Sequence, residues 1–366
     1  MTRRPARPAA APLPGRPDDA ASMPRISARS RREMAAAGIT DPGLQAAYAL
    51  ARQLNARHGK TYYLATLLLP AAKRPYVHAL YGFARYADDI VDNLDPALAP
   101  ADKADRFDQW AGAFLAGLSR AESGDPVCRA VIDTIGHWQI PAEYFGDFLR
   151  SMRTDLTVSR YETFDDLCDY MWGSAAVIGL QMLPILGRAN PPPGPEALRR
   201  AAIDLGLAFQ LTNFLRDIGE DLDRGRIYLP QQSLRRFAVT PRDLLAARQG
   251  GPVTDAIRDL VAAEIARARG LYASAAAGIP LVDVTSRDCL HTALTLYSEI
   301  LDGIEDARYD VFSSRVSVGA GRRMAVAGRG LARARAARRR FAAARQLPEL
   351  AARSAGHAAG PQRKTP

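Results

Sequence analysis

The chain has 366 residues, 48% of them hydrophobic, a composition typical of a globular protein with one large core or two ordinary domains. Its net charge of +10 lies in the ends: residues 1–40 carry 8 Arg against 3 acids, and residues 319–366 carry 12 Lys or Arg against one Glu, which leaves −6 on residues 41–318. Because a nucleic-acid enzyme is expected to carry its positive charge on the folded body, this distribution argues against nucleic acid as a partner.

Residues 1–40 are rich in Pro, Ala and Arg, and we predict that they form a flexible tail. The basic residues at the start are not followed by a continuous apolar stretch, so we do not expect a secretory signal. Met34 would also make a credible start, which would make the first 33 residues dispensable.

Residues 41–318 are predicted to form one all-α domain, because Ala, Leu and Arg recur at helical spacing while strand-like alternation is scarce. Four turn signals interrupt the pattern without being long enough for a domain linker: LDPALAP, SGDP, ANPPPGPE and RQGGPVTD. No segment approaches the roughly 20 uninterrupted apolar residues of a membrane span.

Residues 319–366 form a second basic tail, which we expect to be an Arg-rich helix at most. It lacks the sustained apolar face that deep membrane insertion requires. The basic tails are suited to peripheral contact with anionic lipid, but solubilising ends are an equally good interpretation.

A polar face runs along the helix predicted for ALYGFARYADDIVDN. Tyr81, Arg85, Asp88 and Asp92 fall within about 60° of arc. Apolar residues lie opposite this line, so the pattern taken alone is equally typical of a solvated surface helix. Asp89 lies about 100° off the line and is the weaker candidate.

A second polar face runs along the helix predicted for AFQLTNFLRDIGED, where Gln210, Asn213, Asp217 and Asp221 fall within about 80°. Apolar residues flank this line, which suits a cavity wall better than open solvent. Each line ends in two aspartates at i, i+4, and neither pair has a Lys or Arg four residues further on to relieve their repulsion.

Paired oxygen ligands without His or Cys suit Mg²⁺, or Mn²⁺ in its place, because Mg²⁺ is typically bound by one or two carboxylates together with substrate phosphates. Two such pairs on facing helices would hold a diphosphate through its metal ions, with the carrier of the diphosphate in an apolar tunnel between the helices. The candidates to neutralise the departing diphosphate are Lys60, Arg85, Arg216, Arg224 and Arg226.

Four ordered blocks of the sequence resemble the squalene and phytoene synthase family, the head-to-head prenyltransferases, over about residues 50–318. They are HGKTYYLATLLLPAAKRPYVHALYGFARYADDIVDN, MRTDLTVSRYETFDDLCDYMWGSAAVIGLQMLPILG, QLTNFLRDIGEDLDRGRIYLPQQSL and LYSEILDGIEDARYDVFSSRVSV. The resemblance implies a single-domain helical bundle of the isoprenoid-synthase type with a central substrate cavity.

The resemblance also implies roles for the residues of both polar faces. Asp88 with Asp92, and Asp217 with Asp221, would be the two metal-binding motifs. Gln210 and Asn213 would line the second metal face, with Asn213 as a further ligand.

Arg85 and Arg216 would contact the diphosphate. Tyr81 and Tyr170 would face the reacting carbocation, whose charge an aromatic face stabilises.

The family's HxKS motif at the entrance to the site is matched by His58, Lys60 and Thr61, although its usual serine after the histidine is Gly59 here. Arg224 and Arg226 would close over the diphosphate, with a purely structural role as the alternative.

The reaction that the resemblance implies begins when one allylic diphosphate loses its diphosphate with metal assistance. The double bond of a second molecule attacks the cation and gives a cyclopropyl diphosphate. Reionisation, rearrangement and proton loss then give phytoene from two geranylgeranyl diphosphates in carotenoid biosynthesis. Phosphates, Tyr170 or ordered water would take the protons.

The blocks look most like those of bacterial phytoene synthases, and the chain has no GxGxxG fingerprint, so we do not expect NADPH to be used. Squalene, dehydrosqualene or presqualene diphosphate, made from farnesyl diphosphate, are the alternatives within the family. A chain-elongating prenyl-diphosphate synthase would share DDIVD, but the second motif reads DIGED. A catalytically inactive scaffold protein is the alternative of another class, and the presence of all four aspartates argues against it.

The three cysteines, Cys128, Cys168 and Cys289, are odd in number and have no CxxC spacing, which indicates a reducing, cytosolic compartment. We therefore expect a cytoplasmic protein, peripheral to the inner face of the membrane through its tails, with a downstream desaturase as a partner.

Overall fold

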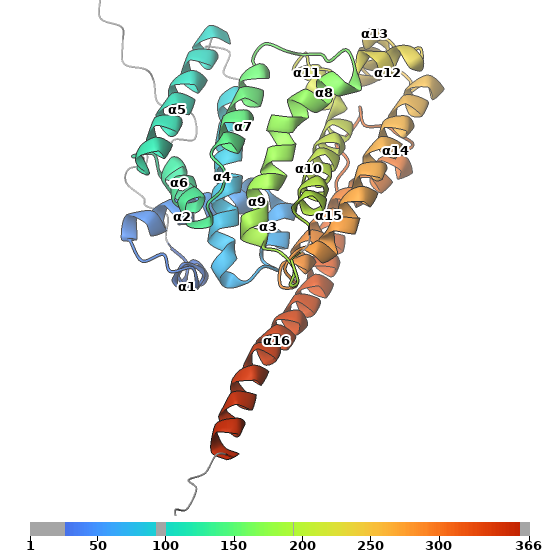
Figure 1. The fold of residues 1–366 in the computed structure, drawn as a ribbon. Helices are drawn as coiled ribbons and strands as arrows, with labels where there is room; N and C mark the ends of the chain where they lie inside the picture. Colours follow the sequence, from blue (N-terminus) through green and yellow to red (C-terminus); the bar gives the residue numbers. More distant parts are fainter. Residues whose placement is uncertain (1–25, 93–99, 193, 359–366) are drawn as a thin grey trace, which may run out of the picture.

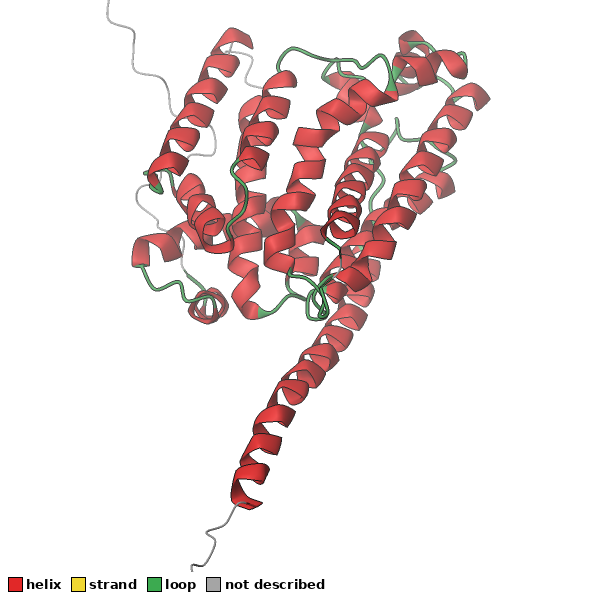
Figure 2. Cartoon of the chain, in the orientation of Figure 1, coloured by secondary structure: helices red, strands yellow, loops and turns green. Residues whose placement is uncertain are grey.

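The computed structural model describes residues 26–92, 100–192 and 194–358, with no side chains described at Pro100 and 342–358. Helices make up most of these ranges, which contain no strand beyond two isolated bridges (Figure 2). The all-α prediction is confirmed.

The α-helices, in chain order, are α1 (Ala28–Ala36), α2 (Pro42–His58), α3 (Lys60–Thr66), α4 (Arg74–Val91), α5 (Pro100–Arg120), α6 (Pro126–Trp138), α7 (Glu143–Thr154), α8 (Phe164–Met171), α9 (Val177–Leu186), α10 (Pro195–Arg216), α11 (Ile218–Asp223), α12 (Gln231–Arg236), α13 (Pro241–Arg248), α14 (Asp255–Gly278), α15 (Arg287–Asp306) and α16 (Ala320–Ala358). Two 3₁₀ turns, η1 (Ala71–Lys73) and η3 (Ile279–Leu281), and one π-helical turn, η2 (Trp172–Ala176), complete the order.

Three of the four predicted turn signals fall between helices. SGDP separates α5 from α6, ANPPPGPE separates α9 from α10, and RQGGPVTD separates α13 from α14. The helices that follow begin with features that favour a start, such as Pro195 in the first turn of α10 and Thr254 capping α14. LDPALAP, apart from Pro100, lies outside the described residues.

The buried side chains form two hydrophobic clusters. The first comes mostly from α1, α2, α4, α5, α6, α7 and α9, and the second from α8 and from α10 to α15. Phe209 on α10 packs against both clusters. The helix with the first aspartate pair at its end, α4, therefore belongs to one cluster, and the segment with the second pair, the end of α10 and α11, belongs to the other.

Close backbone packing fixes α10 against η2, the turn that follows Tyr170. A Cβ atom at Gly206 would lie 2.6 Å from the carbonyl oxygen of Ala175, so only glycine allows this approach. π-Helical turns are often found at functional sites. The packing holds α8, with Tyr170, close to the polar end of α10.

Residues 26–40 differ from the flexible tail that the sequence predicted. They include α1, which Ser27 caps by accepting a hydrogen bond from the Ser30 amide, and which buries Met34 to 2% exposure. The buried carboxylate of Glu33 accepts bonds from Arg29, Arg52 and Arg74. The prediction was wrong for this part because the tail's average composition concealed one capped helix with a buried ion cluster. Residues 1–25 lie outside the described part of the chain.

This cluster makes Glu33 important for stability, and a start at Met34 would delete it. We expect Glu33→Ala to lower the free energy of unfolding by about 3–5 kcal/mol, because Arg52 and Arg74 would be left largely buried without their partner. The matched control is Arg29→Ala, which removes a half-exposed i, i+4 pair worth about 0.3–0.5 kcal/mol. Urea unfolding measures both, and equal losses in the two variants would contradict this account.

The C-terminal segment forms the predicted Arg-rich helix, α16, which begins against the body and extends away from it (Figure 1). Val326, Ala327 and Ala334 are buried, and Arg333 forms an ion pair with Asp288 on α15. The first turns are therefore part of the folded body and not a free tail. No helix in the described ranges is both long and apolar enough to cross a membrane.

Candidate active site

The first aspartate pair lies at the end of α4. Asp88 is in its last turn, and Asp92 follows as the C-cap residue. Phe83, Ala87 and Ile90 are buried on the other side of the helix, as the spacing predicted. Burial and the charge of Asp92 raise the pKa of Asp88 to about 8.

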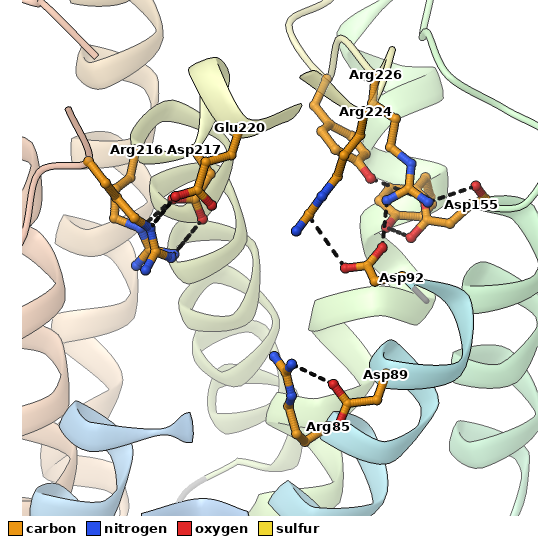
Figure 3. A network of polar contacts seen from close by, with 12 residues as sticks. Arg85, Asp89, Asp92, Asp155, Arg216, Asp217, Glu220, Arg224 and Arg226 are labelled. Carbon is orange, nitrogen blue, oxygen red and sulfur yellow. Dashed lines mark hydrogen bonds and ion pairs between the residues drawn. The ribbon is translucent and has the colours of Figure 1, made fainter. Parts of the chain in front are cut away.

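Asp92 is paired with two arginines from the second half of the chain. Arg226 Nη1 donates to Asp92 Oδ1 at 2.9 Å, and Arg224 Nη1 lies 3.5 Å from Oδ2 (Figure 3). The predicted diphosphate-binding arginines and the first aspartate pair thus meet in space, although more than 130 residues separate them in the sequence.

The second pair, Asp217 and Asp221, is not on one continuous helix, and this part of the prediction was wrong. The chain leaves helical geometry at Asp217, which ends α10 and caps α11. Adjacent residues do not face each other on a helix, yet Arg216 Nε and Nη2 reach both oxygens of Asp217, at 2.8 and 2.5 Å. The Asp221 amide still donates to the Asp217 carbonyl at 2.8 Å, so one helical turn preserves the spacing of the pair.

A second arginine, Arg315, also binds Asp217 with two bonds, of 2.7 and 3.1 Å. Burial opposes the ionisation of Asp217, but the bonds from Arg216 and Arg315 outweigh burial and hold its pKa below the usual value. Asp221 forms no such ion pair in the described structure, and burial together with the charge of Asp217 raises its pKa to about 8.

The two pairs share one electrostatic pattern: one aspartate is bound by arginines, and the other has a raised pKa. The paired members are Asp92 and Asp217, and the others are Asp88 and Asp221. Asp88 and Asp221 therefore lack the direct guanidinium partners that hold Asp92 and Asp217 in the described structure, and carboxylates without a bound counter-ion are suited to bind a cation.

The raised pKa values predict how the stability of the metal-free protein depends on pH. In folded protein Asp88 and Asp221 keep their protons up to about pH 8, whereas in unfolded chains they lose them near pH 3.8. Their contribution to the free energy of unfolding is therefore fully present below about pH 3.8 and is lost as the pH rises to about 8.

Urea unfolding in EDTA at about pH 5, 7 and 9 checks this prediction. Comparison with the double variant Asp88→Asn, Asp221→Asn isolates the two groups. We expect the free energy of unfolding to fall less steeply with pH in this variant than in the wild type. Equal slopes in both proteins would contradict the assignment.

The residues around the two pairs fit a divalent metal that is completed by its substrate. No three His, Cys, Asp or Glu side chains of the described residues come together as a closed metal cage. Asn213 Oδ1 is buried without a hydrogen-bond partner there, while its Nδ2 lies 3.4 Å from Gln210 Oε1. An unused amide oxygen beside two carboxylates is a suitable Mg²⁺ ligand, with diphosphate oxygens filling the remaining positions.

Arg85 pairs with Asp89, not with the two aspartates of the motif (Figure 3). Asp89 is therefore held by an arginine, and the sequence had also ranked it below Asp88 and Asp92 as a metal ligand. The Nε atom of Arg85 is buried and has no partner among the described residues, so one donor remains available for a ligand.

Two groups of aromatic rings lie beside the polar site. The ring centroid of Tyr81 lies 6.1 Å from that of Tyr62, and the Tyr62 centroid lies 4.8 Å from that of Tyr297. Tyr170 belongs to the other group, with Tyr161, Tyr228 and Phe214. The sequence singled out only Tyr81 and Tyr170, one from each group.

The predicted entrance residues lie where α2 meets α3. His58 is largely exposed, but the partial desolvation of its ring, together with the charge of Arg85, lowers its pKa. Lys60 and Thr61 form no recorded side-chain bond to the site within the described ranges, so their roles stay predictions. A Cβ atom at Gly59 would lie 2.6 Å from the Tyr81 ring, so Tyr81 occupies the space that a serine would need.

Two functional residues were missed by the sequence reasoning. Arg315 binds Asp217 across 98 residues, and the partly buried Asp155 accepts bonds from Tyr170 and Tyr228. Burial raises the pKa of Asp155 to about 6. No spacing pattern marked either residue, because each reaches the site through tertiary contacts.

A hollow of about 760 Å³ opens between α7 and α8, on residues that include Arg150, Asp169 and Tyr170. Its lining mixes charged side chains with aromatic rings, so it is not the apolar cavity expected between the helices. The central substrate cavity therefore stays a prediction from the fold.

Comparison with known proteins decides the family. A sequence model described as squalene/phytoene synthase matches residues 55–322, more than half of the chain. The chain belongs to the squalene/phytoene synthase family. It is 38% identical over 279 residues to the phytoene synthase of Arthrospira platensis, covering 74% of this chain and 88% of the relative. It is also 38% identical over 282 residues to the 15-cis-phytoene synthase of a Synechocystis strain, covering 75% and 81%.

Solved structures of the squalene/phytoene synthase family share the fold. A dehydrosqualene synthase in complex with a ligand aligns with a TM-score of 0.70 and 28% identity, covering 78% of this chain and 96% of that one. The squalene synthase HpnC from Alicyclobacillus acidocaldarius aligns with a TM-score of 0.63 and 28% identity, covering 75% and 98%. The isoprenoid-synthase-type bundle is confirmed.

Proposed function

We propose that this protein is a phytoene synthase, which condenses two geranylgeranyl diphosphates head to head through a cyclopropyl diphosphate and thus serves carotenoid biosynthesis. The observation that carries the proposal is the similarity to phytoene synthases, at 36–38% identity over 74–80% of the chain. The arginines bound to Asp92 and to Asp217 also support the proposal, because such a reaction needs carboxylates for metal ions and cationic partners for diphosphate.

The proposed metal ligands are Asp88, Asp92, Asn213, Asp217 and Asp221. Mg²⁺, or Mn²⁺ in its place, supplies Lewis-acid assistance to diphosphate departure when it is bound. Arg216, Arg226 and Arg315 already neutralise aspartates of the site, so they are placed to stabilise the negative charge of the leaving diphosphate.

The aromatic rings complete the proposed mechanism. Tyr81 and Tyr170 present ring surface near the polar site, where it stabilises a carbocation and keeps water from it. The final proton loss leaves a neutral hydrocarbon, so no reductant and no NADPH are required.

A C15 substrate is the second candidate, because solved relatives at 28% identity carry the names dehydrosqualene synthase and squalene synthase. The test supplies purified protein and Mg²⁺ with farnesyl or geranylgeranyl diphosphate, each alone and at equal concentration, with and without NADPH. We expect phytoene from the C20 substrate irrespective of NADPH. A predominantly C30 product from the mixture would assign the C15 reaction, and no hydrocarbon from either substrate would refute the synthase function.

We also propose that the protein is cytoplasmic and binds the inner face of the membrane peripherally through α16, where its hydrocarbon product passes to a desaturase. Arg335, Arg339 and Arg340 support this, since no acidic partner is recorded for them within the described residues. Free Cys128, Cys168 and Cys289 suit a reducing compartment.

Cosedimentation with vesicles tests the proposed membrane contact. We expect binding to vesicles that contain phosphatidylglycerol, lost with Arg339→Gln, Arg340→Gln and at high salt. Equal binding to neutral phosphatidylcholine vesicles, or none to either kind, would contradict the proposal.

A further inference from the structure

We propose that Asp155 is a positioning residue of the reacting centre, which orients Tyr170 and Tyr228 through its carboxylate and Arg226 through its peptide carbonyl. The inference deepens the proposed function and rests on it for its kinetic consequences. Asp155 lies outside both aspartate motifs, at the C-cap of α7.

Both oxygens of the Asp155 carboxylate accept bonds from tyrosines. Tyr170 Oη donates to Oδ2 at 2.7 Å, and Tyr228 Oη donates to Oδ1 at 3.3 Å. No ion pair to this carboxylate is present in the described structure, so its bonds go to the phenols and not to an arginine. Asp155 therefore differs from Asp92 and Asp217, whose carboxylates are held by guanidinium groups.

The two tyrosines that Asp155 holds are part of one stack of rings. Tyr228 lies parallel to Phe214 with centroids 4.0 Å apart, and Tyr170 lies 5.9 Å from Tyr228 with an angle of 25° between the planes. Tyr161 lies 5.2 Å from Tyr170. A phenol that donates a hydrogen bond to a carboxylate cannot turn freely, and the bond polarises its O–H group and makes its ring more electron-rich. Asp155 thus fixes two ring faces and strengthens their attraction for a cation.

The backbone around Asp155 is joined to the first aspartate motif and to the loop that follows the second. Arg226 Nη2 donates to the Asp155 carbonyl at 3.1 Å, while Nη1 of the same side chain donates to Asp92 (Figure 3). Beyond this point the two loops run side by side, with the Ile227 amide bonded to the Ser159 carbonyl and the Gln231 amide to the Tyr161 carbonyl. Asp155 is therefore at the junction of α7, the first motif and the loop after the second.

The bonds of Asp155 define its role as positioning. Its oxygens are occupied by hydroxyls, whereas Asp88 and Asp221 have no such bonds and are better placed as metal ligands. A residue that orients rings acts on the conversion of bound substrate and not on substrate capture. Its loss should lower kcat while leaving KM nearly unchanged.

The test compares Asp155→Asn, which keeps the size of the side chain but loses one acceptor and the charge, with Asp169→Asn. Asp169 is an exposed acid next to Tyr170 on α8 and serves as the matched control. With geranylgeranyl diphosphate and Mg²⁺ we expect Asp155→Asn to lower kcat about 30- to 100-fold, with KM within about threefold, and Asp169→Asn to behave like the wild type.

Two further readouts separate positioning from a merely structural role. More of the product should leave as the cyclopropyl diphosphate or as alcohols formed by water, because the cation is held less well. The Asp155→Asn, Tyr170→Phe double variant should be no slower than the slower single variant, since both changes break the same bond. Tyr228→Phe, the milder change, should reproduce a smaller part of the effect.

Independent effects of Asp155→Asn and Tyr170→Phe that multiply in the double variant would overturn the proposal, and so would unchanged kcat or an effect confined to KM. Near-UV circular dichroism of the stacked tyrosines tests the orientation without any turnover. We expect a changed tyrosine signal in Asp155→Asn at an unaltered far-UV spectrum, and an unchanged signal would overturn the positioning role. If the wild type makes no hydrocarbon but Asp155→Asn still shows the dichroism change, the proposed function is refuted and the positioning role of Asp155 is not.

Discussion

Asp88→Asn and Asp217→Asn are each expected to lower kcat/KM for phytoene formation by about a thousandfold or more while the protein stays folded. Each substitution removes one carboxylate from a pair, and the described residues contain no group of three His, Cys, Asp or Glu side chains that could hold the metal without it. Loss of a metal that assists diphosphate departure costs several kcal/mol in the transition state, and about 1.4 kcal/mol corresponds to a factor of ten in rate. Steady-state kinetics at saturating Mg²⁺ measures the loss.

The matched control for these variants is Asp223→Asn. Asp223 lies two residues beyond Asp221 but pairs with Arg248 at the surface, away from the site. We expect it to retain nearly full activity. Asp88→Asn should also stabilise the metal-free protein at about pH 9, because it removes a buried carboxylate whose ionisation is unfavourable. Near-normal turnover in both site variants would disprove the assignment of the two pairs.

Arg226→Ala is expected to lower kcat/KM by about a hundredfold. The guanidinium of Arg226 is largely buried and joins Asp92 to the carbonyl of Asp155, so no water molecule can replace its fixed charge. Loss of one preorganised donor to a developing anion typically costs about 10²–10³ in rate. Arg226→Lys should recover only a small part, because an ammonium group cannot make both contacts with the same geometry. Assays of the three proteins at equal Mg²⁺ measure the effect.

Arg224→Ala is the natural comparison for Arg226→Ala. Arg224 approaches the same aspartate at 3.5 Å and is about one-third exposed, so we expect its loss to cost no more than about tenfold. Equal losses of kcat/KM in Arg224→Ala and Arg226→Ala would show that the bond from Arg226 to the Asp155 carbonyl does not contribute to catalysis, and would contradict this account.

The sequence predicted the parts of the site that depend on local spacing. The pairs Asp88–Asp92 and Asp217–Asp221 were identified because i, i+4 carboxylates on a helix share one face, whichever partner the helix packs against. The apolar residues opposite them, such as Phe83 and Ile90, are buried as expected. Turn signals rich in Pro and Gly likewise marked three of the gaps between helices.

The parts that the sequence missed depend on contacts between distant segments. Asp155 reaches Tyr228 across 73 residues, and Arg315 reaches Asp217 across 98. Neither contact leaves a periodic trace in the sequence. The break at Asp217 was also missed, because the residues on both sides of it follow helical spacing; at the break its carboxylate is bound by Arg216 and by the distant Arg315. The ordered helix α1 was hidden by the Pro- and Arg-rich composition around it.

The central claim is that the two aspartate pairs support a head-to-head condensation, and its stoichiometry is the most direct test. Purified protein would be incubated with geranylgeranyl diphosphate and Mg²⁺, without NADPH, and both released diphosphate and C40 hydrocarbon would be counted over time. We expect two diphosphates for each phytoene, with a cyclopropyl diphosphate appearing between the two releases. One diphosphate for each condensation, with a longer prenyl diphosphate as the product, would contradict the account.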